Sequence, residues 1–113
     1  MPVLKQADAI PESIGEGRTR YLTHLDQLMM VVIDFHDGPA EEPDTPHHHP
    51  HEQITYVATG ELLFFIDGEP TRLGPGDMIA VPSSVPHTIQ TLTEHVRLVD
   101  TFQPLRDEFI GND

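Results

Sequence analysis

Short apolar runs separated by turn residues repeat along most of this chain. These runs are rich in β-branched and aromatic residues, as strands are, and no stretch keeps helical spacing for more than two turns. The final segment has room for one short turn of helix. We therefore predict an all-β fold. The predicted strands occupy residues 27–35, 53–59, 61–66, 70–73, 78–82, 83–92 and 96–102.

Turn signals indicate that neighbouring strands run antiparallel. Asp67-Gly68, between the runs 61–66 and 70–73, is a dipeptide that favours a two-residue hairpin loop. Residues 74–77, Gly-Pro-Gly-Asp, predict a second tight turn. The chain has no internal repeat and no linker, so we expect one domain, an antiparallel sandwich or small barrel.

Composition is consistent with this architecture and limits the possible chemistry. The chain has 113 residues, enough for one core, with 11 prolines and 8 glycines for turns. It contains no cysteine, which excludes disulfides and thiolate metal sites. The N-terminus lacks an apolar segment behind a basic start, and no run reaches membrane-spanning length. We expect a cytoplasmic protein.

The excess of acidic residues limits the kinds of molecule that the protein can bind. There are 19 acidic side chains against 6 basic ones, a net charge of −13 with neutral histidines. Such a surface repels nucleic acid and anionic membranes, so we expect neither as a partner. It also repels anionic small molecules, which could bind only where positive charge dominates locally.

A histidine cluster near the middle of the chain indicates metal chemistry. His47 and His49 are two apart, so on an extended strand both imidazoles face the same way, about 6–7 Å apart at Cα. Gln53 has the same parity and could add an amide oxygen, and His87 could complete the site from a distant strand. Imidazole and amide ligands without thiolate suit nickel, zinc, iron, manganese or cobalt.

Two alternatives remain open at this point. His51 shares the parity of His49, but Pro50 lies between them and indicates a bend, so the facing of His51 is undetermined. The cluster could also be a surface loop that binds metal only adventitiously. His48, between the two candidate ligands, should point away from them.

The spacing of these residues resembles two motifs of the cupin family. The stretch 47–60 resembles the first motif, with glutamine where glutamate is commoner, through His47, His49, Gln53 and Gly60. The stretch 76–87 resembles the second, with serine in place of the usual glycine, through Gly76, Pro82, Ser84 and His87. The resemblance implies a single cupin domain over residues 1–113. Its fold would be a conical jelly-roll β-barrel. The metal ion would be held in the wider mouth by His47, His49, Gln53 and His87.

A ligand set without a carboxylate favours Lewis-acid chemistry. Because Gln53 is neutral, the site keeps the full charge of a divalent ion, which strengthens its attraction for substrate oxygens and stabilises a trivalent ion less well. We therefore favour isomerisation, ring opening or cyclisation over dioxygenation.

The run 96–102 adds a candidate acid. Val96, Leu98, Asp100 and Phe102 share one strand face, and three of them are apolar, as a barrel interior requires. An inward carboxylate is costly unless it is paired or near a cation, so Asp100 is a candidate general acid/base. Exposure through a bulge, or a structural ion pair with Arg97 or Arg106, remains the alternative.

Residues 26–62 together with 99–109, including the Asp-x-Phe…Pro-x-Arg-Asp ending, resemble the KdgF-type pectin-degradation cupins. That family converts 4,5-unsaturated monouronates, released from pectin or alginate, to the linear 4-deoxy-5-keto uronate. The resemblance implies a metal-dependent isomerase in which Asp100 and Phe102 are the catalytic residues. Of the six cationic side chains, Arg106 is our first choice for the substrate carboxylate.

Other functions are compatible with the same motifs. A cupin dioxygenase or cyclase acting on another small oxygenated molecule is one alternative, and a non-catalytic sugar- or metal-binding cupin is another. We also expect a homodimer, because four residues make the strand faces more apolar than one small barrel needs. These residues are Tyr56, Leu63, Phe64 and Phe65.

Overall fold

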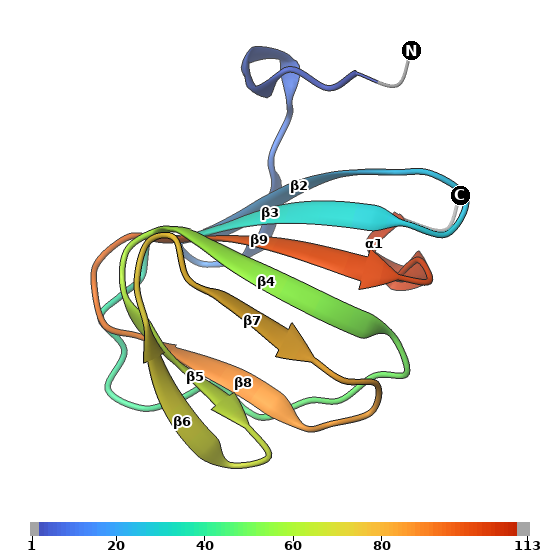
Figure 1. The fold of residues 1–113 in the computed structure, drawn as a ribbon. Coiled ribbons are helices and arrows are strands. Elements are labelled where there is room, and N and C mark those ends of the chain that lie inside the picture. Colours follow the sequence, from blue (N-terminus) through green and yellow to red (C-terminus); the bar gives the residue numbers. More distant parts are fainter. Residues whose placement is uncertain (1–2, 111–113) are drawn as a thin grey trace.

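The computed structural model describes residues 3–110, in which two antiparallel sheets face each other (Figure 1). Within that range there are nine strands, a short 3-10 helix, η1 (Gln6–Asp8), and a helix of one turn, α1 (Asp107–Ile110). The strands are β1 (Glu12–Gly15), β2 (Arg18–His24), β3 (Met29–Phe35), β4 (Glu52–Thr59), β5 (Leu62–Ile66), β6 (Glu69–Leu73), β7 (Met78–Val81), β8 (His87–Thr91) and β9 (Val96–Gln103). The predicted all-β fold and the terminal helical turn are confirmed.

The larger sheet has six strands in the order β1-β2-β3-β9-β4-β7, and the smaller has three in the order β6-β5-β8. In β9 every second residue is buried, beginning at Val96 and including Asp100 and Phe102. The predicted inward face of this strand is therefore confirmed. It places a carboxyl and an aromatic ring between the two sheets.

The core lies between the sheets and closes one end of the barrel. Its main cluster consists of Phe35, Val57, Leu62, Phe64, Leu73, Val81, Val96 and Leu98. A smaller cluster of Met29, Val31 and Phe102 packs beside it, with Leu105 and Phe109 from the C-terminal segment against it. Phe35, Phe64 and Leu98 also line the cavity described below, so the apolar core forms the floor of that cavity.

The Asp67-Gly68 hairpin is confirmed. Asp67 has φ 50° and Gly68 has φ 85°, and β5 and β6 pair on either side, from Ile66↔Glu69 onward. Two successive left-handed residues match the twist of the flanking strands, which is why this dipeptide favours tight hairpins.

Strands β1 and β2 were not predicted, since the first expected strand began at residue 27. β2 reads Arg-Thr-Arg-Tyr-Leu-Thr-His, which is too polar for an apolar period to show. It is nevertheless paired with β3 along its whole length, from Arg18↔Phe35 to His24↔Met29. Its arginines are satisfied by carboxylates, because Arg20 pairs with Glu12 at 2.9 Å. Ion pairing and backbone pairing thus replace apolar burial here.

No helix in residues 3–110 is both long enough and apolar enough to cross a membrane.

Candidate metal centre

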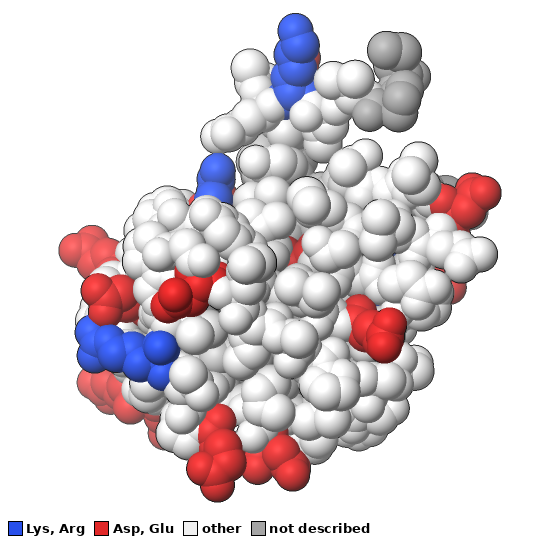
Figure 2. Space-filling view, viewed as in Figure 1, with Lys and Arg blue, Asp and Glu red and all other residues white. Residues whose placement is uncertain are grey.

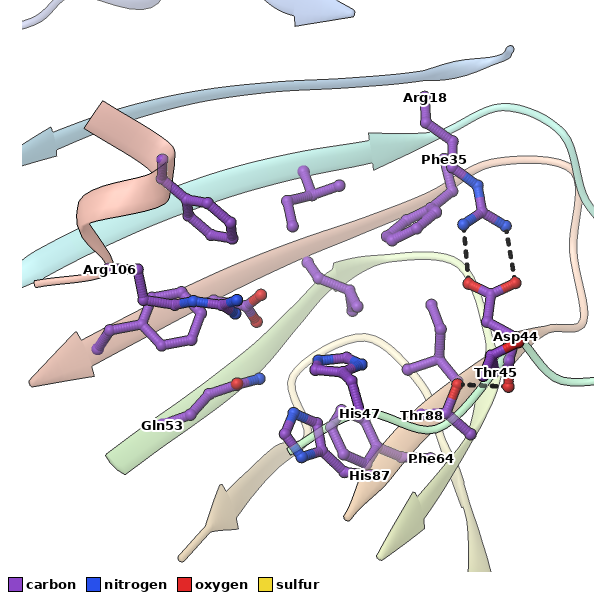
Figure 3. A pocket seen from close by; sticks show the side chains of 16 residues that line it. Arg18, Phe35, Asp44, Thr45, His47, Gln53, Phe64, His87, Thr88 and Arg106 are labelled. Atoms are coloured by element: carbon purple, nitrogen blue, oxygen red, sulfur yellow. Dashed lines mark hydrogen bonds and ion pairs between the residues drawn. The ribbon is translucent and has the colours of Figure 1, made fainter. Parts of the chain in front are cut away.

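Three of the predicted ligands converge at one end of the barrel. His47 and His49 come from the segment before β4, and His87 begins β8. Their candidate ligand nitrogens all lie within 4.8 Å of one another. His49 is 6% exposed and His87 is 2% exposed, whereas His47 is on the solvent side. Figure 3 shows the rings of His47 and His87 side by side at the wall of the cavity.

Backbone hydrogen bonds fix this convergence. The His47 amide donates to the His87 carbonyl at 3.0 Å, and the His87 amide donates back at 2.9 Å, an isolated antiparallel bridge. These bonds join the segment that carries His47 to β8, and the amide of Asp44 adds a further bond to the Ile89 carbonyl at 3.0 Å. Ser84 donates its amide to the carbonyl of His49 at 2.7 Å and has φ 65°. That left-handed conformation explains why the family motif usually has glycine at this position.

His87 is prepared to act as a ligand. Its Nδ1 lies 2.9 Å from the carbonyl of Val85, so Nδ1 carries the proton and Nε2 the lone pair. Nε2 is buried and has no hydrogen-bond partner. An unpaired buried acceptor is costly, and a bound cation removes that cost.

His49 gives independent support for a cation. Its Nδ1 lies 3.1 Å from the His51 carbonyl and its Nε2 lies 3.1 Å from Oε1 of Gln53. Both partners are acceptors, but a neutral imidazole has one N–H. Burial, Arg106 and His87 lower the pKa of His49, which disfavours the doubly protonated ring. A metal ion held by Nε2 and the amide oxygen would satisfy both atoms, so His47, His49, Gln53 and His87 fit a divalent ion.

The histidines stay neutral under ordinary conditions, as metal ligands must. Burial, with the charges of His87 and Arg106, lowers the pKa of His47 to about 4. Burial also lowers the pKa of His87, and Arg106 acts in the same direction. Proton competition for the site is therefore weak near neutral pH.

Asp100 is linked to the candidate ligand Gln53 through Thr55. Gln53 Nε2 donates to Thr55 Oγ1 at 2.9 Å, and Thr55 Oγ1 donates to Asp100 Oδ1 at 2.6 Å. Burial raises the pKa of Asp100 to about 6, against the opposing effects of Thr55 and Arg106. The alternative of a structural ion pair does not hold, because Arg97 pairs with Asp34 at 2.9 Å and Arg106 pairs with Glu108 at 2.7 Å.

Arg106 lies at the same cavity with Phe102. Its guanidinium carbon is 5.2 Å from the ring centre of Phe102 and 4.3 Å from that of Phe109. It pairs with Glu108 at 2.7 Å, at the solvent edge. Arg106 is thus held as a cation within reach of the cavity, where it lowers the pKa values of all three histidines.

The cavity has a volume of about 370 Å³, which is in the range of small-molecule sites. Asp100, Phe102, Arg106 and the candidate ligands His47, Gln53 and His87 line it. The opposite side is formed by Arg18 and Asp44, joined by two hydrogen bonds of 2.8 and 3.2 Å (Figure 3). Asp44 was not selected from the sequence, because nothing in its surroundings distinguishes it from other loop carboxylates.

His51 packs edge-on against His49, with ring centres 5.4 Å apart, but it is not one of the converging histidines. Its Nε2 lies 2.9 Å from the carbonyl of Leu105, so it anchors the C-terminal segment. A second His/Asp group, Asp34, His36 and His95, lies near the start of β9. Arg97 occupies both carboxylate oxygens of Asp34, and His95 approaches one of them at 2.7 Å. That group is accounted for as an ion-pair network.

Comparisons with known proteins find similarity over most of the chain. Residues 32–102 match the cupin domain family. The chain is 38% identical over 101 residues to the pectin degradation protein KdgF of Dickeya dadantii, covering 88% of this chain and 89% of that protein. Two solved structures superpose with a TM-score of 0.84. They are KdgF from a Halomonas species, 31% identical, with coverage of 93% of this chain and 94% of that one, and an RmlC-like cupin from Shewanella frigidimarina, 34% identical, with coverage of 94% and 93%.

Proposed function

Because this chain is a member of the cupin family, and its fold is the cupin barrel, we propose that it is a metal-dependent isomerase of 4,5-unsaturated monouronates. The product is the linear 4-deoxy-5-keto uronate. Similarity to the pectin degradation protein KdgF over 88% of the chain supports the substrate class.

One observation carries the proposal. Asp100, a buried carboxyl with a raised pKa, lines the same cavity as His47, His87 and Arg106, and a ring nitrogen of His49 lies within 4.8 Å of those of the other two histidines. A binding module has no use for such a carboxyl, whereas proton transfer within a sugar needs one with a pKa near neutral. Arg106 supplies positive charge for an acidic sugar, which the surface as a whole repels.

A divalent ion, when bound, supplies Lewis-acid attraction for the substrate carboxylate and for the oxygen on which charge develops. Asp100, as the carboxylate, takes the proton of the C1 hydroxyl while the bond from C1 to the ring oxygen breaks. This leaves an aldehyde at C1 and an enolate over C4, C5 and the former ring oxygen. The carboxyl of Asp100 then gives the proton to C4, which forms the C5 ketone. Nothing is added or lost, so the net reaction is an isomerisation.

The remaining cavity residues orient the sugar and exclude water. Phe102 is 2% exposed, and its ring packs edge-on to His49, with ring centres 5.7 Å apart. It thus holds a ligand ring in place and forms an apolar wall beside the sugar. Arg106 pairs with the substrate carboxylate in place of Glu108.

The test follows the C4=C5 absorbance of unsaturated monouronate, made fresh by an exolytic lyase, with metal-loaded protein. We expect decay faster than the spontaneous rate and no oxygen uptake. Decay at the spontaneous rate with metal-loaded protein would overturn the assignment. Oxygen uptake would point instead to a dioxygenase.

The role of Arg106 gives a separate prediction. Arg106→Gln should raise KM for the uronate roughly 10- to 100-fold, as expected for the loss of a charged hydrogen bond, and should not weaken metal binding, because Arg106 is not a candidate ligand. Glu108→Gln is the matched control, because it removes the present partner of Arg106 and should leave KM unchanged or lower it. An unchanged KM in Arg106→Gln would assign the carboxylate to another cation.

The homodimer is also a proposal, and the outer face of the six-stranded sheet supports it. Of the four residues that led us to expect a dimer, Tyr56 is 42% exposed on this face, whereas Phe64 is buried in the core. Ile54 and Met78, on the same face, are 54% and 68% exposed. Figure 2 shows a face whose central part carries few charges. Two chains of charge −13 repel each other, so a second copy approaches most easily through an uncharged face.

Light scattering after size-exclusion chromatography tests this surface. We expect a dimer that Met78→Lys converts to a monomer. Leu25→Lys, at an equally exposed apolar residue in the β2–β3 turn, should leave the dimer intact. A wild-type monomer at high protein concentration would contradict the proposal.

A further inference from the structure

Thr55 is a polar residue in a position that packing alone would give to valine. It lies on the inner face of β4 and is 0% exposed. A buried hydroxyl is costly unless its hydrogen bonds are made. Here they are made, and both lead to residues of the proposed site.

The hydroxyl joins two strands. Thr55 and Asp100 are direct partners in the β4–β9 ladder, and Gln53 lies two residues before Thr55 on the same face of β4. Thr55 Oγ1 accepts from Gln53 Nε2 at 2.9 Å and donates to Asp100 Oδ1 at 2.6 Å. A candidate ligand and a candidate acid/base are therefore linked through one side chain.

The single hydrogen of the hydroxyl gives this chain a direction. Because that hydrogen points to Asp100, the oxygen of Thr55 is left to accept, and the group of Gln53 that faces it must be the NH₂. The amide oxygen of Gln53 is then turned to the other side, 3.1 Å from Nε2 of His49. This is the orientation in which Gln53 can coordinate a cation.

We propose that Thr55 is a positioning residue of the metal centre, which selects the orientation of the Gln53 amide that presents its oxygen to the ion. The proposal deepens the function proposed above and rests on its metal site, but not on the uronate reaction. An amide needs a partner that fixes its orientation, because only its oxygen can bind the ion and its NH₂ group cannot. A carboxylate at the same position would present an oxygen in either orientation.

The test compares Thr55→Val with Thr55→Ser by titrating the metal-free proteins with Co²⁺. Valine keeps the shape and the β-branch but removes the hydroxyl, whereas serine keeps the hydroxyl. We expect Thr55→Val to weaken Co²⁺ binding roughly 10- to 100-fold, as is typical when the partner of a ligand is lost. Its cobalt absorption spectrum should change as well. Thr55→Ser should restore both the affinity and the spectrum.

A second variant, Gln53→Glu, distinguishes an effect on the orientation of the Gln53 amide from an effect on packing. In Gln53→Glu, the added Thr55→Val substitution should cost much less affinity than it does in the wild type, because a carboxylate needs no orienting partner. Circular dichroism checks that each variant is folded, and Thr55→Ala, which also lacks the hydroxyl, replaces Thr55→Val if the valine variant does not fold.

Several results would overturn the proposal: wild-type affinity and spectrum in Thr55→Val, no recovery in Thr55→Ser, or an equal loss in both backgrounds. Since Co²⁺ is the only probe, a wild-type protein that fails the uronate assay overturns the proposed reaction and leaves the role of Thr55 standing.

Discussion

Asp100→Asn is expected to lower the rate of ring opening roughly 100- to 10,000-fold while metal binding is retained, because proton transfer by a placed carboxyl contributes about that much. Asparagine has nearly the same shape, and its amide oxygen can still accept the hydrogen bond from Thr55, which is 2.6 Å long in the wild type. It cannot take a proton from the C1 hydroxyl. The measurement is the decay of the C4=C5 absorbance, with metal content determined on the same samples.

The pH dependence should change with the same substitution. In the proposed reaction the carboxylate form of Asp100 acts first, so the wild-type rate should fall as the pH is lowered through the pKa of Asp100. Burial raises that pKa to about 6 in the absence of metal, and a nearby cation favours the carboxylate, so the fall should lie at or below this value. Asp100→Asn should lose this inflection.

A control variant distinguishes the loss of proton transfer by Asp100 from the general effect of removing a buried carboxyl. Asp34 is also buried, at 8% exposed, but pairs with Arg97 and His95 rather than facing the cavity. Asp34→Asn should therefore lower the free energy of unfolding and keep the rate per folded molecule. A rate loss in Asp34→Asn as large as that in Asp100→Asn would refute the assignment of Asp100.

His49→Ala is expected to abolish both tight metal binding and activity. Loss of a residue that is hydrogen-bonded to a metal ligand typically lowers metal affinity about 10- to 100-fold. Loss of a ligand itself should lower the affinity more than about 100-fold. His49 holds the centre of the arrangement, since its Nε2 faces Gln53 and its ring contacts those of His47 and His87. Calorimetric metal titration and the uronate assay check the two effects.

The neighbouring His48 is the matched control. It is exposed, between the two candidate ligands, and outside the group of converging nitrogens. His48→Ala should retain metal affinity and rate, although it removes one imidazole from the same segment. Equal losses in both variants would mean that the segment binds metal as an unstructured histidine loop.

The sequence is most informative where the alternation of side chains along one extended segment determines which way each residue faces. The alternation in residues 96–102 predicted that Asp100 and Phe102 face inward with Leu98, and the structure places them so. The His-x-His spacing predicted that His47 and His49 face one point, which the structure also shows. There the order of residues along one extended segment is sufficient.

The rest could not be predicted because it depends on which strands meet. The Thr55–Asp100 contact joins residues 45 apart, and it exists because β4 pairs with β9 in one register. The pair of Arg18 and Asp44 likewise depends on a long loop returning to the cavity. Strand β2 was missed because its interactions are ionic, as between Arg20 and Glu12. A pattern of apolar positions does not show such contacts.

The central claim is that one metal ion, held by the histidine cluster and Gln53, makes this protein a uronate isomerase. The most direct measurement adds a divalent ion stepwise to metal-free protein and follows the rate of uronate ring opening against the amount of metal bound. We expect the rate to rise in proportion to bound metal and to level off at one ion per chain, with no such rise in His49→Ala. A rate that does not depend on bound metal, or that keeps rising with adventitious ions beyond one per chain, would contradict the account.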